Sequence, residues 1–315
     1  MEQAVVEISG SSRSQTNLCL LCSLPLEVRF SAVPDPESGE IFSIWQCRQC
    51  GLGHTRPTPE DLKRYYKPGY HGDRHSFSAE HCVRRRLRWL HQVSGRAQGK
   101  KLLDIGCGEG AFLLAARGAG WQVWGTELEP AAARAQDLPV AASLGELADA
   151  APYDCVTFWH SLEHMPDPVK VIDDAVSLLK PGGSVMIAVP DAAGWQAAAF
   201  GESWLHLDVP RHLYHFSQVS LERLLKSSGL KTIRIWHQEF EYDLLGWSQS
   251  ALNKIFSARN VFFDVLRGQI RRRTLGQRAL HSLIGSVSAG LALPLLPMAA
   301  SFGHGGTLVV AATKS

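Results

Sequence analysis

The residues best suited to chemistry in this sequence are two carboxylates and a row of glycines near position 105. Gly106, Gly108 and Gly110 follow a short apolar run, and Asp104 comes two residues before the first glycine. Glycine lacks a Cβ and tolerates positive φ, so such a turn lets a ligand lie against the backbone. A helix starting just after it would point free N–H groups at that ligand. The pattern predicts a nucleotide-type site, with Asp104 facing a cationic group.

A second carboxylate follows the next apolar run. Residues 122–126 lead into Glu127, which is placed like the acid that binds ribose hydroxyls in dinucleotide folds. A carboxylate there repels a 2′-phosphate and suits an unphosphorylated ribose. The third glycine comes one residue earlier than in the dinucleotide fingerprint G-x-G-x-x-G, so the turn differs from an NAD site.

Alternating strands and helices must position these groups. Apolar runs predict strands at 102–105, 122–126, 139–141, 155–159, 184–189, 232–236 and 308–312. Helices are expected between them at 109–116, 130–136, 168–179 and 217–225. This alternation predicts an α/β fold, with a parallel sheet covered by helices on both faces.

The glycine turn with Asp104 and Glu127 resembles motif I and the motif II acid of the class I S-adenosylmethionine-dependent methyltransferases. "YDCVTFWHSLEHMPDP", "LLKPGGSVMIAVP" and "DVPRHLYHFS" are similar to later segments of a broad bacterial group of these enzymes. That group often carries an N-terminal cysteine ribbon and a Y-Y-x-x-x-Y segment, found here at 65–70. The resemblance covers residues 19 to about 240 and the last strand. It implies a Rossmann-like fold with a mostly parallel seven-stranded sheet.

The same resemblance implies S-adenosylmethionine as cofactor. Asp104 would hold the methionine ammonium group, Gly106 and Gly108 the cofactor backbone, and Glu127 the ribose. Three further candidates for cofactor contact are Cys107, Gly110 and His160.

Two C-x-x-C pairs precede this region, Cys19 with Cys22 and Cys47 with Cys50. Four soft thiolates on two turns form the tetrahedral set that a structural zinc ion prefers. Such a closed site leaves no open coordination position, so its expected role is structural. The alternative is a group of buried or redox-active thiols. Either way, the cysteines fit a reducing compartment better than a disulfide framework.

The predicted organisation follows from these segments: a flexible tail (1–17), a zinc ribbon (18–57), a helical linker (58–98), the catalytic domain (99–240), a helical and apolar insertion (241–304) and the final strand (305–315). In the linker, Thr58 as N-cap with Pro59 behind it predicts one helix, and residues 78–93 predict a second. We expect the arginines at 84–86 and 88 to form a solvated face, or to meet a phosphate-bearing substrate.

Methyl transfer is an in-line displacement that needs an aligned, desolvated acceptor. A hydroxyl or acidic C–H acceptor also needs a base, which favours histidine. By the resemblance, the acceptor lies beyond the carboxyl ends of the strands at 155–159 and 184–189. The polar residues that follow them are His160, Glu163 and His164, and then His206, Asp208, Arg211, His212, Tyr214 and His215. The catalytic candidates are His160, Glu163, His164 and His212, with His164 and His212 preferred for base or acceptor positioning.

His160-x-x-Glu163-His164 also spells the inverted zinc-protease motif. Pro166 follows at once and prevents the long helix that this motif requires. A closer comparison is the quinone-ring O-methyltransferases, which are similar at Glu163-His164 and use a Glu-x-x-Glu-His segment to support a divalent metal. Here His160 replaces the first glutamate.

Residues 279–303 contain no Asp, Glu, Lys or Arg, and Arg271–Arg273 and Arg278 precede them. The run is long enough for a membrane segment, but glycines and prolines break it, and the final strand must return to the sheet. Two interpretations stay open: a lipid-surface helix or re-entrant hairpin, and an apolar lid or dimer face. The first suggests a lipid-linked acceptor, such as a polyprenyl-bound glycan or a quinone-like ring. The protein would then be cytoplasmic and peripheral at the inner face of the membrane.

The leading hypothesis is therefore methyl transfer to a small-molecule, sugar or lipid-linked acceptor. An RNA methyltransferase that clamps RNA with the ribbon and the 84–88 arginines is one alternative; the net charge of +2 argues against it. The other is a non-catalytic cofactor-binding or membrane scaffold, which would not need to keep both Asp104 and Glu127. Glu2 and Glu7 in the opening residues argue against a secretory signal.

Overall fold

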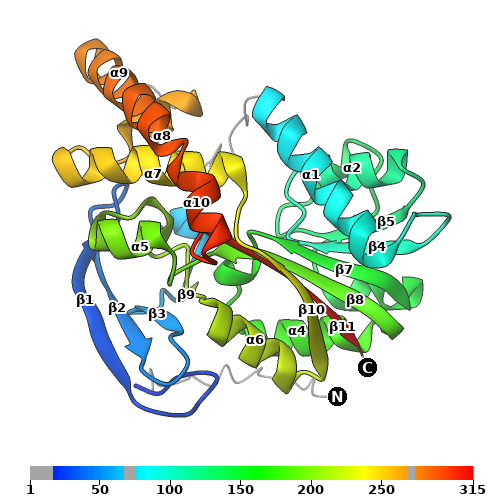
Figure 1. Ribbon diagram of the computed structural model, residues 1–315. Coiled ribbons are helices and arrows are strands. Elements are labelled where there is room, and N and C mark those ends of the chain that lie inside the picture. The colour runs from blue at the N-terminus through cyan, green and yellow to red at the C-terminus, as the bar shows by residue number, and fades with distance from the viewer. Residues whose placement is uncertain (1–16, 67–75, 269–273, 315) are drawn as a thin grey trace, which may run out of the picture.

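The computed structural model describes residues 17–66, 76–268 and 274–314 (Figure 1). Three features of interest in the sequence fall outside this range. They are nearly all of the tail at 1–17, the end of the tyrosine segment at 67–70, and Arg271–Arg273.

A seven-stranded sheet forms the centre of the protein. Its strands are β4 (Lys101–Ile105), β5 (Gln122–Thr126), β6 (Val140–Ala141), β7 (Tyr153–Trp159), β8 (Leu179–Pro190), β10 (Leu230–Trp236) and β11 (Thr307–Lys314), in the order β10-β11-β8-β7-β4-β5-β6. The pairs from β6 to β8 are parallel, and β11 is antiparallel to both of its neighbours. The mostly parallel, seven-stranded, Rossmann-like sheet is confirmed.

Helices cover both faces of this sheet (Figure 1). They include α1 (Ser76–Ser94), α2 (Ala111–Gly118), α3 (Ala131–Arg134), α4 (Pro168–Ser177) and α6 (Gln218–Ser227). Another helix, α5 (Trp195–Phe200), packs on the ribbon, and short 3-10 turns lie at Leu144–Ala150, Leu162–His164, Gly201–Ser203 and Leu205–Leu207. Along β8, Val185 and Ile187 pack into one apolar cluster with α4 and α6, whereas Met186 packs into another with α1 and α2. Both faces of the strand are buried, so its sequence is continuously apolar instead of alternating.

Strand order reverses at β4, which has β5 on one side and β7 on the other. In an open parallel sheet, ligands bind outside the carboxyl ends of the strands at such a point. The glycine turn after β4 and the histidine segment after β7 are therefore brought to one edge.

The N-terminal cysteine segment builds a second, antiparallel sheet, visible at the lower left of Figure 1. It contains β1 (Leu26–Pro34), β2 (Ile41–Cys47), β3 (Gly53–Arg56) and β9 (Tyr214–His215). Residues 26–56 supply three strands, and the fourth comes from the segment that follows β8. The ribbon also shares a continuous apolar cluster with the central sheet, in which Leu52 packs together with Leu221 of α6.

Two local predictions are wrong. Thr58 does not cap a helix: its hydroxyl bonds to Thr55 O and accepts a hydrogen bond from Arg56, and only a 3-10 turn (Lys63–Tyr65) follows. β8 also begins at Leu179 instead of Ser184, because Leu179 already pairs with Tyr153 of β7. At Thr58 a neighbouring turn uses the hydroxyl, whereas at Leu179 pairing with a strand distant in the chain overrides the local turn signal.

Four helices separate β10 from β11: α7 (Phe240–Ile255), α8 (Val261–Leu266), α9 (Leu275–Ala292) and α10 (Leu295–Ser301). α9 packs closely on α8, since a Cβ at Gly285 would lie 2.6 Å from the Phe262 ring. Within the described residues, no single helix is long and apolar enough to cross a bilayer. Taken together, α9 and α10 have the length and the apolar composition, but the chain bends by 46° between them.

Candidate active site

The turn after β4 has a backbone that only glycine adopts easily. Gly106, Gly108 and Gly110 have φ values of 74°, 55° and 85°. A Cβ at Gly106 would lie 2.5 Å from Ser161 Cβ, and one at Gly110 would lie 2.2 Å from Leu138 Cδ1. At Gly106 and Gly110 side chains are thus excluded by conformation and by space. At Gly108 no atom lies within 4 Å of the Cβ position, so this glycine leaves room for a ligand against the backbone.

The two predicted carboxylates lie at this turn. Asp104 is 2% exposed and accepts a 2.6 Å hydrogen bond from Thr157 Oγ1. Burial raises the pKa of Asp104 to about 7, so the group is poised between its neutral and charged forms near neutral pH. Glu127 accepts hydrogen bonds of 2.8 Å from the amides of Gly108 and Leu128. The structure therefore places an acid on each side of the glycine turn.

Cys107 contributes its backbone to this turn, because its thiol points away into the protein. Its amide bonds to Thr126 O at 3.0 Å. A Cβ at Gly125 would lie 2.8 Å from Cys107 Sγ, which places the thiol against β5. Burial raises the pKa of this thiol well above its usual range, so it stays neutral.

His160 is held in a buried network that its sequence position did not reveal. Its Nε2 lies 2.7 Å from Glu239 Oε2, and its ring stacks on Tyr242 at 4.0 Å. Burial lowers the pKa of His160, but Tyr242, Glu163 and Glu239 outweigh this effect and raise the pKa to about 9. His160 is therefore a fixed imidazolium near neutral pH and is unsuited to act as a base.

The partner of this imidazolium is also bound by an arginine. Arg86 donates two hydrogen bonds of 2.8 Å to Glu239, and the two side chains are 4% and 0% exposed. Arg85 pairs with Glu239 and with Glu241. The expected solvated face is therefore wrong for Arg85 and Arg86, which are used inside the protein and are not available to clamp RNA.

Glu163, His164 and His212 come together from two loops, as the sequence predicted. One ligand atom from each lies within 4.8 Å of the others, so the trio could hold a cation as well as a proton. Glu163 is 1% exposed, and its two oxygens have no hydrogen-bond partner among the described residues. Although burial raises the pKa of Glu163, the facing histidines His160, His164 and His212 lower it to about 2.

Backbone carbonyls orient the two imidazoles of this trio. His164 Nδ1 lies 3.0 Å from Arg211 O, and His212 Nδ1 lies 2.8 Å from His206 O. A carbonyl only accepts, so His212 Nδ1 carries the hydrogen and its Nε2 keeps a lone pair when the ring is neutral. His164 Nδ1 lies within hydrogen-bond distance of both Arg211 O and the Tyr66 hydroxyl. Burial lowers the pKa of His164 to about 4, so this ring is neutral near pH 7.

Tyr66 was not singled out by the sequence as a site residue, although it lies in the tyrosine segment. Its hydroxyl is 2.9 Å from His164 Nδ1, and burial raises its pKa well above the usual range.

Arg86, Glu239 and Tyr242 were missed as well. Only their spatial convergence identifies them, since they come from α1 and from the junction of β10 with α7.

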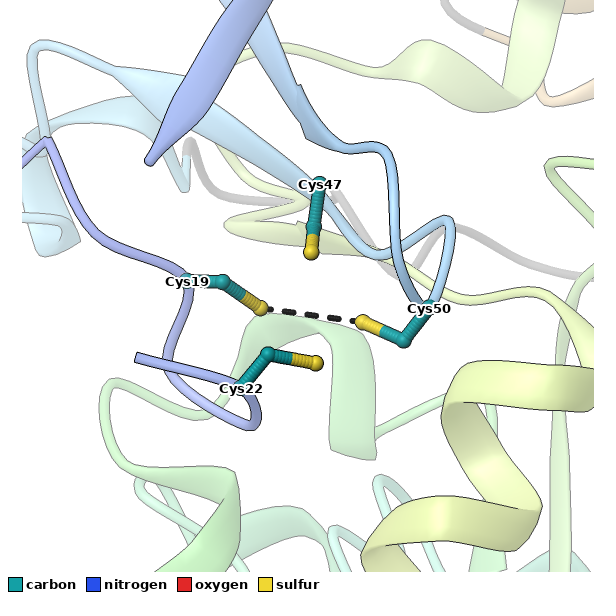
Figure 2. A group of neighbouring side chains, drawn as sticks. All are labelled: Cys19, Cys22, Cys47 and Cys50. Atoms are coloured by element: carbon teal, nitrogen blue, oxygen red, sulfur yellow. Dashed lines mark hydrogen bonds between the residues drawn. The ribbon is translucent and has the colours of Figure 1, made fainter. Parts of the chain in front are cut away.

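The four predicted cysteines converge with their sulfur atoms facing one another (Figure 2). Cys19 Sγ and Cys50 Sγ are 3.6 Å apart, and all four thiols are free. Arg223 of α6 donates a 2.7 Å hydrogen bond to Cys22 Sγ. The cluster thus has the composition and closeness of a four-thiolate metal site.

Comparison with known proteins identifies the family. The model of the family described as "Methyltransferase domain" matches residues 77–235. The chain belongs to this methyltransferase family. The match includes the glycine turn, both carboxylates and the Glu163–His212 region, and it confirms the predicted enzyme class, a class I S-adenosylmethionine-dependent methyltransferase. The ribbon and the α7–α10 insertion lie outside the match.

Two relatives by sequence agree with this assignment. The chain is 30% identical over 189 residues to a ubiquinone biosynthesis O-methyltransferase of Thiobacillus denitrificans, covering 54% of this chain and 77% of the relative. It is 37% identical over 164 residues to the enzyme of the same name from Bordetella avium, covering 46% and 68%. A solved S-adenosylmethionine-dependent methyltransferase from Archaeoglobus fulgidus is 16% identical, with a TM-score of 0.46 over 81% of this chain and 100% of that chain.

The buried network around Glu239 leads to a stability prediction. Glu239→Gln removes the carboxylate that neutralises Arg86 and His160, so we expect a loss of about 3–5 kcal/mol in the free energy of unfolding. Urea denaturation near neutral pH measures it. Glu80→Gln, which breaks an exposed pair with Arg84, is the matched control and should change little. Equal losses in both variants would contradict the assigned role of Glu239.

Proposed function

We propose that this methyltransferase transfers the methyl group of S-adenosylmethionine to a small ring or sugar acceptor that is carried at a membrane surface. The observation that carries the proposal is the division of one sheet edge into two halves. Asp104 and Glu127 flank the glycine turn in the first half, which suits the cofactor. Glu163, His164 and His212 form the second half, which suits an acceptor that must lose a proton.

For the cofactor we propose the roles that the family resemblance implied. Asp104 binds the methionine ammonium group, the backbone of the turn from Gly106 to Gly110 lies against the cofactor, and Glu127 binds the ribose hydroxyls. The carboxyl of Asp104 supports the first role, because it is buried and accepts a hydrogen bond from Thr157. A bound cation would stabilise its charged form, which burial disfavours. His160 would line this half together with Tyr242, on which its ring stacks.

This cofactor site predicts a pH-dependent affinity. Below its pKa of about 7, Asp104 binds a proton in competition with the ammonium group, so the affinity for S-adenosylmethionine should fall on acidification. We expect a decrease of about tenfold between pH 8 and pH 6 by calorimetric titration. Asp104→Asn should bind more weakly and lose the pH dependence, and NAD should not bind. A wild-type affinity independent of pH would count against Asp104 as the ammonium ligand.

For the acceptor half we propose His164 as the general base, with His212 and Glu163 beside it. The acceptor oxygen attacks the methyl carbon, the carbon–sulfur bond breaks, and S-adenosylhomocysteine leaves. The acceptor proton passes to His164 Nε2. The convergence of His164 with Glu163 and His212 supports this role. The lowered pKa of about 4 keeps the ring neutral near pH 7, although it also makes the ring a weaker base than an ordinary histidine.

Methyl transfer to a polyprenyl catechol and to nucleotide sugars, followed with labelled S-adenosylmethionine, tests the histidines. His164→Gln and His212→Gln should each lower kcat by about 10²–10⁴-fold while leaving cofactor affinity unchanged. His81→Gln, at an exposed position of α1, is the control. Unchanged kcat in both active-site variants on an accepted substrate would remove the histidines from the chemistry.

We also propose that Cys19, Cys22, Cys47 and Cys50 bind one structural zinc ion. Burial raises the pKa of Cys19 to about 11, which disfavours an isolated thiolate. A zinc ion offsets this cost by binding the thiolate form. With four thiolates the ion has no open position, so its contribution would be to hold the ribbon together.

The surface of α9 supports an acceptor carried by lipid. Leu280, Leu283, Val287 and Leu291 recur every three or four residues, which places them on one side of the helix. They are 47%, 66%, 56% and 72% exposed. The described residues 275–303 include one cation, Arg278, and no acid. Such a surface suits an anionic membrane, so we propose that 279–303 makes a peripheral contact at the inner face. The quinone named in the relatives fits such an acceptor.

Flotation with anionic phosphatidylglycerol vesicles tests this contact. Replacing Leu283 and Leu291 with glutamine together should lower vesicle binding by about tenfold or more, since two apolar side chains no longer leave water. Val219→Gln is the matched control, because Val219 is 59% exposed on α6. If wild-type protein ignores vesicles and the double variant instead converts a dimer to a monomer, the α9 face is a protein interface.

A further inference from the structure

The cysteine ribbon is bonded directly to the loop that carries His212. Thr55 of β3 donates a 2.6 Å hydrogen bond from Oγ1 to His212 O and a 3.0 Å bond from its amide to Leu213 O. On the other side of the loop, the Leu213 amide donates to Glu163 O at 2.9 Å. The backbone at His212 is therefore fixed between the ribbon sheet and the segment that follows β7.

A buried ion pair makes a second connection between the same two parts. Arg211 Nη2 lies 3.0 Å from Asp35 Oδ1 of the ribbon and 2.6 Å from Asp208 Oδ1, and the Arg211 and Asp35 side chains are 3% and 1% exposed. Asp208 in turn places its other oxygen 3.9 Å from His212 Nε2. Arg211 is therefore shared between a carboxylate of its own loop and one of the ribbon, and Asp35 links its buried guanidinium to the ribbon.

We propose that Thr55 and Asp35 are positioning residues for His212, and that the ribbon thereby sets the acceptor half of the site. The inference rests on the proposed function for the role of His212 in acceptor chemistry. The contacts that hold His212 do not depend on that function. Displacement of a reacting group by about 1 Å can lower the rate by 10²-fold. Because the ribbon holds the His212 backbone, it would therefore affect the rate of methyl transfer. The side chains of Asp104 and Glu127 bond to Thr157 and Gly108, which belong to the central domain and not to the ribbon.

The arrangement also connects the cysteine cluster to the acceptor loop. The turn that carries Cys47 and Cys50 joins β2 to β3, the strand that contains Thr55. Cys50 O accepts a 3.3 Å hydrogen bond from Ser217, which follows β9 closely. If the cysteine cluster loosens, the start of β3 and the residue bonded after β9 should therefore both become less ordered. The acceptor half should lose its order before the cofactor half does.

The test uses full-length, zinc-loaded protein and needs no acceptor. Thr55→Val removes the hydroxyl at constant shape, Thr55→Ser restores it, and Asp35→Asn removes the charge. Ser43→Ala is the matched control, because that hydroxyl bonds to Arg56 O within the ribbon. Hydrogen exchange reports on residues 206–215, and ¹⁵N imidazole NMR reports on whether His212 keeps its hydrogen on Nδ1. Calorimetry measures S-adenosylmethionine affinity for each variant.

We expect Thr55→Val and Asp35→Asn to speed exchange in 206–215 by about tenfold and to give a mixture of His212 tautomers. Thr55→Ser should restore both signals, Ser43→Ala should change neither, and cofactor affinity should stay within about threefold. Wild-type exchange and tautomer in both Thr55→Val and Asp35→Asn would overturn the proposal. An equal change in Ser43→Ala would do so as well, because it would reveal general loosening. Failure of the wild-type protein to bind S-adenosylmethionine would instead reject the proposed function and leave the positioning result standing.

Discussion

The buried carboxylate of Glu239 is the constraint on which the arrangement of the site depends. A charge at 0% exposure is tolerated only when it is neutralised nearby, and Glu239 obtains this from Arg86 and His160. These three residues belong to α1, to the segment after β7 and to the junction of β10 with α7. Satisfying one charge thus requires α1 to pack beside the carboxyl end of β7 and α7 to begin next to it. The fixed position of the His160 ring against Glu239 and Tyr242 follows from that requirement.

The same principle gives neighbouring histidines opposite properties. His160 and His164 are four positions apart and both partly buried, yet the pKa of His160 is raised to about 9 and that of His164 is lowered to about 4. His160 faces two carboxylates, whereas burial and His212 dominate at His164. One ring therefore serves as a fixed cation and the other as a neutral acceptor of protons. Environment assigns the roles, since the residue type is identical.

Two segments outside the methyltransferase-domain match flank the acceptor half. The ribbon reaches it through β3 and β9, and the insertion reaches it through α7, where Tyr242 O lies 3.3 Å from His206 Nε2. The cofactor half is made from β4, β5 and the turns that follow them. This division explains why the sequence predicted the candidate residues of both halves but missed the ribbon and α7 contacts that hold the acceptor half, since those contacts come from segments remote in the chain.

The sequence by itself determined the alternation of strands and helices, the glycine turn between two acids and the four-cysteine set, because each depends on residues close together in the chain. It also indicated that Glu163, His164 and His212 would meet, since the carboxyl ends of adjacent parallel strands share an edge. Tertiary structure alone decided that Arg86 and Glu239 hold His160, that β9 completes the ribbon sheet, and that Thr58 starts no helix. The physical reason is that burial and charge compensation depend on three-dimensional neighbours, which local propensity and spacing do not encode.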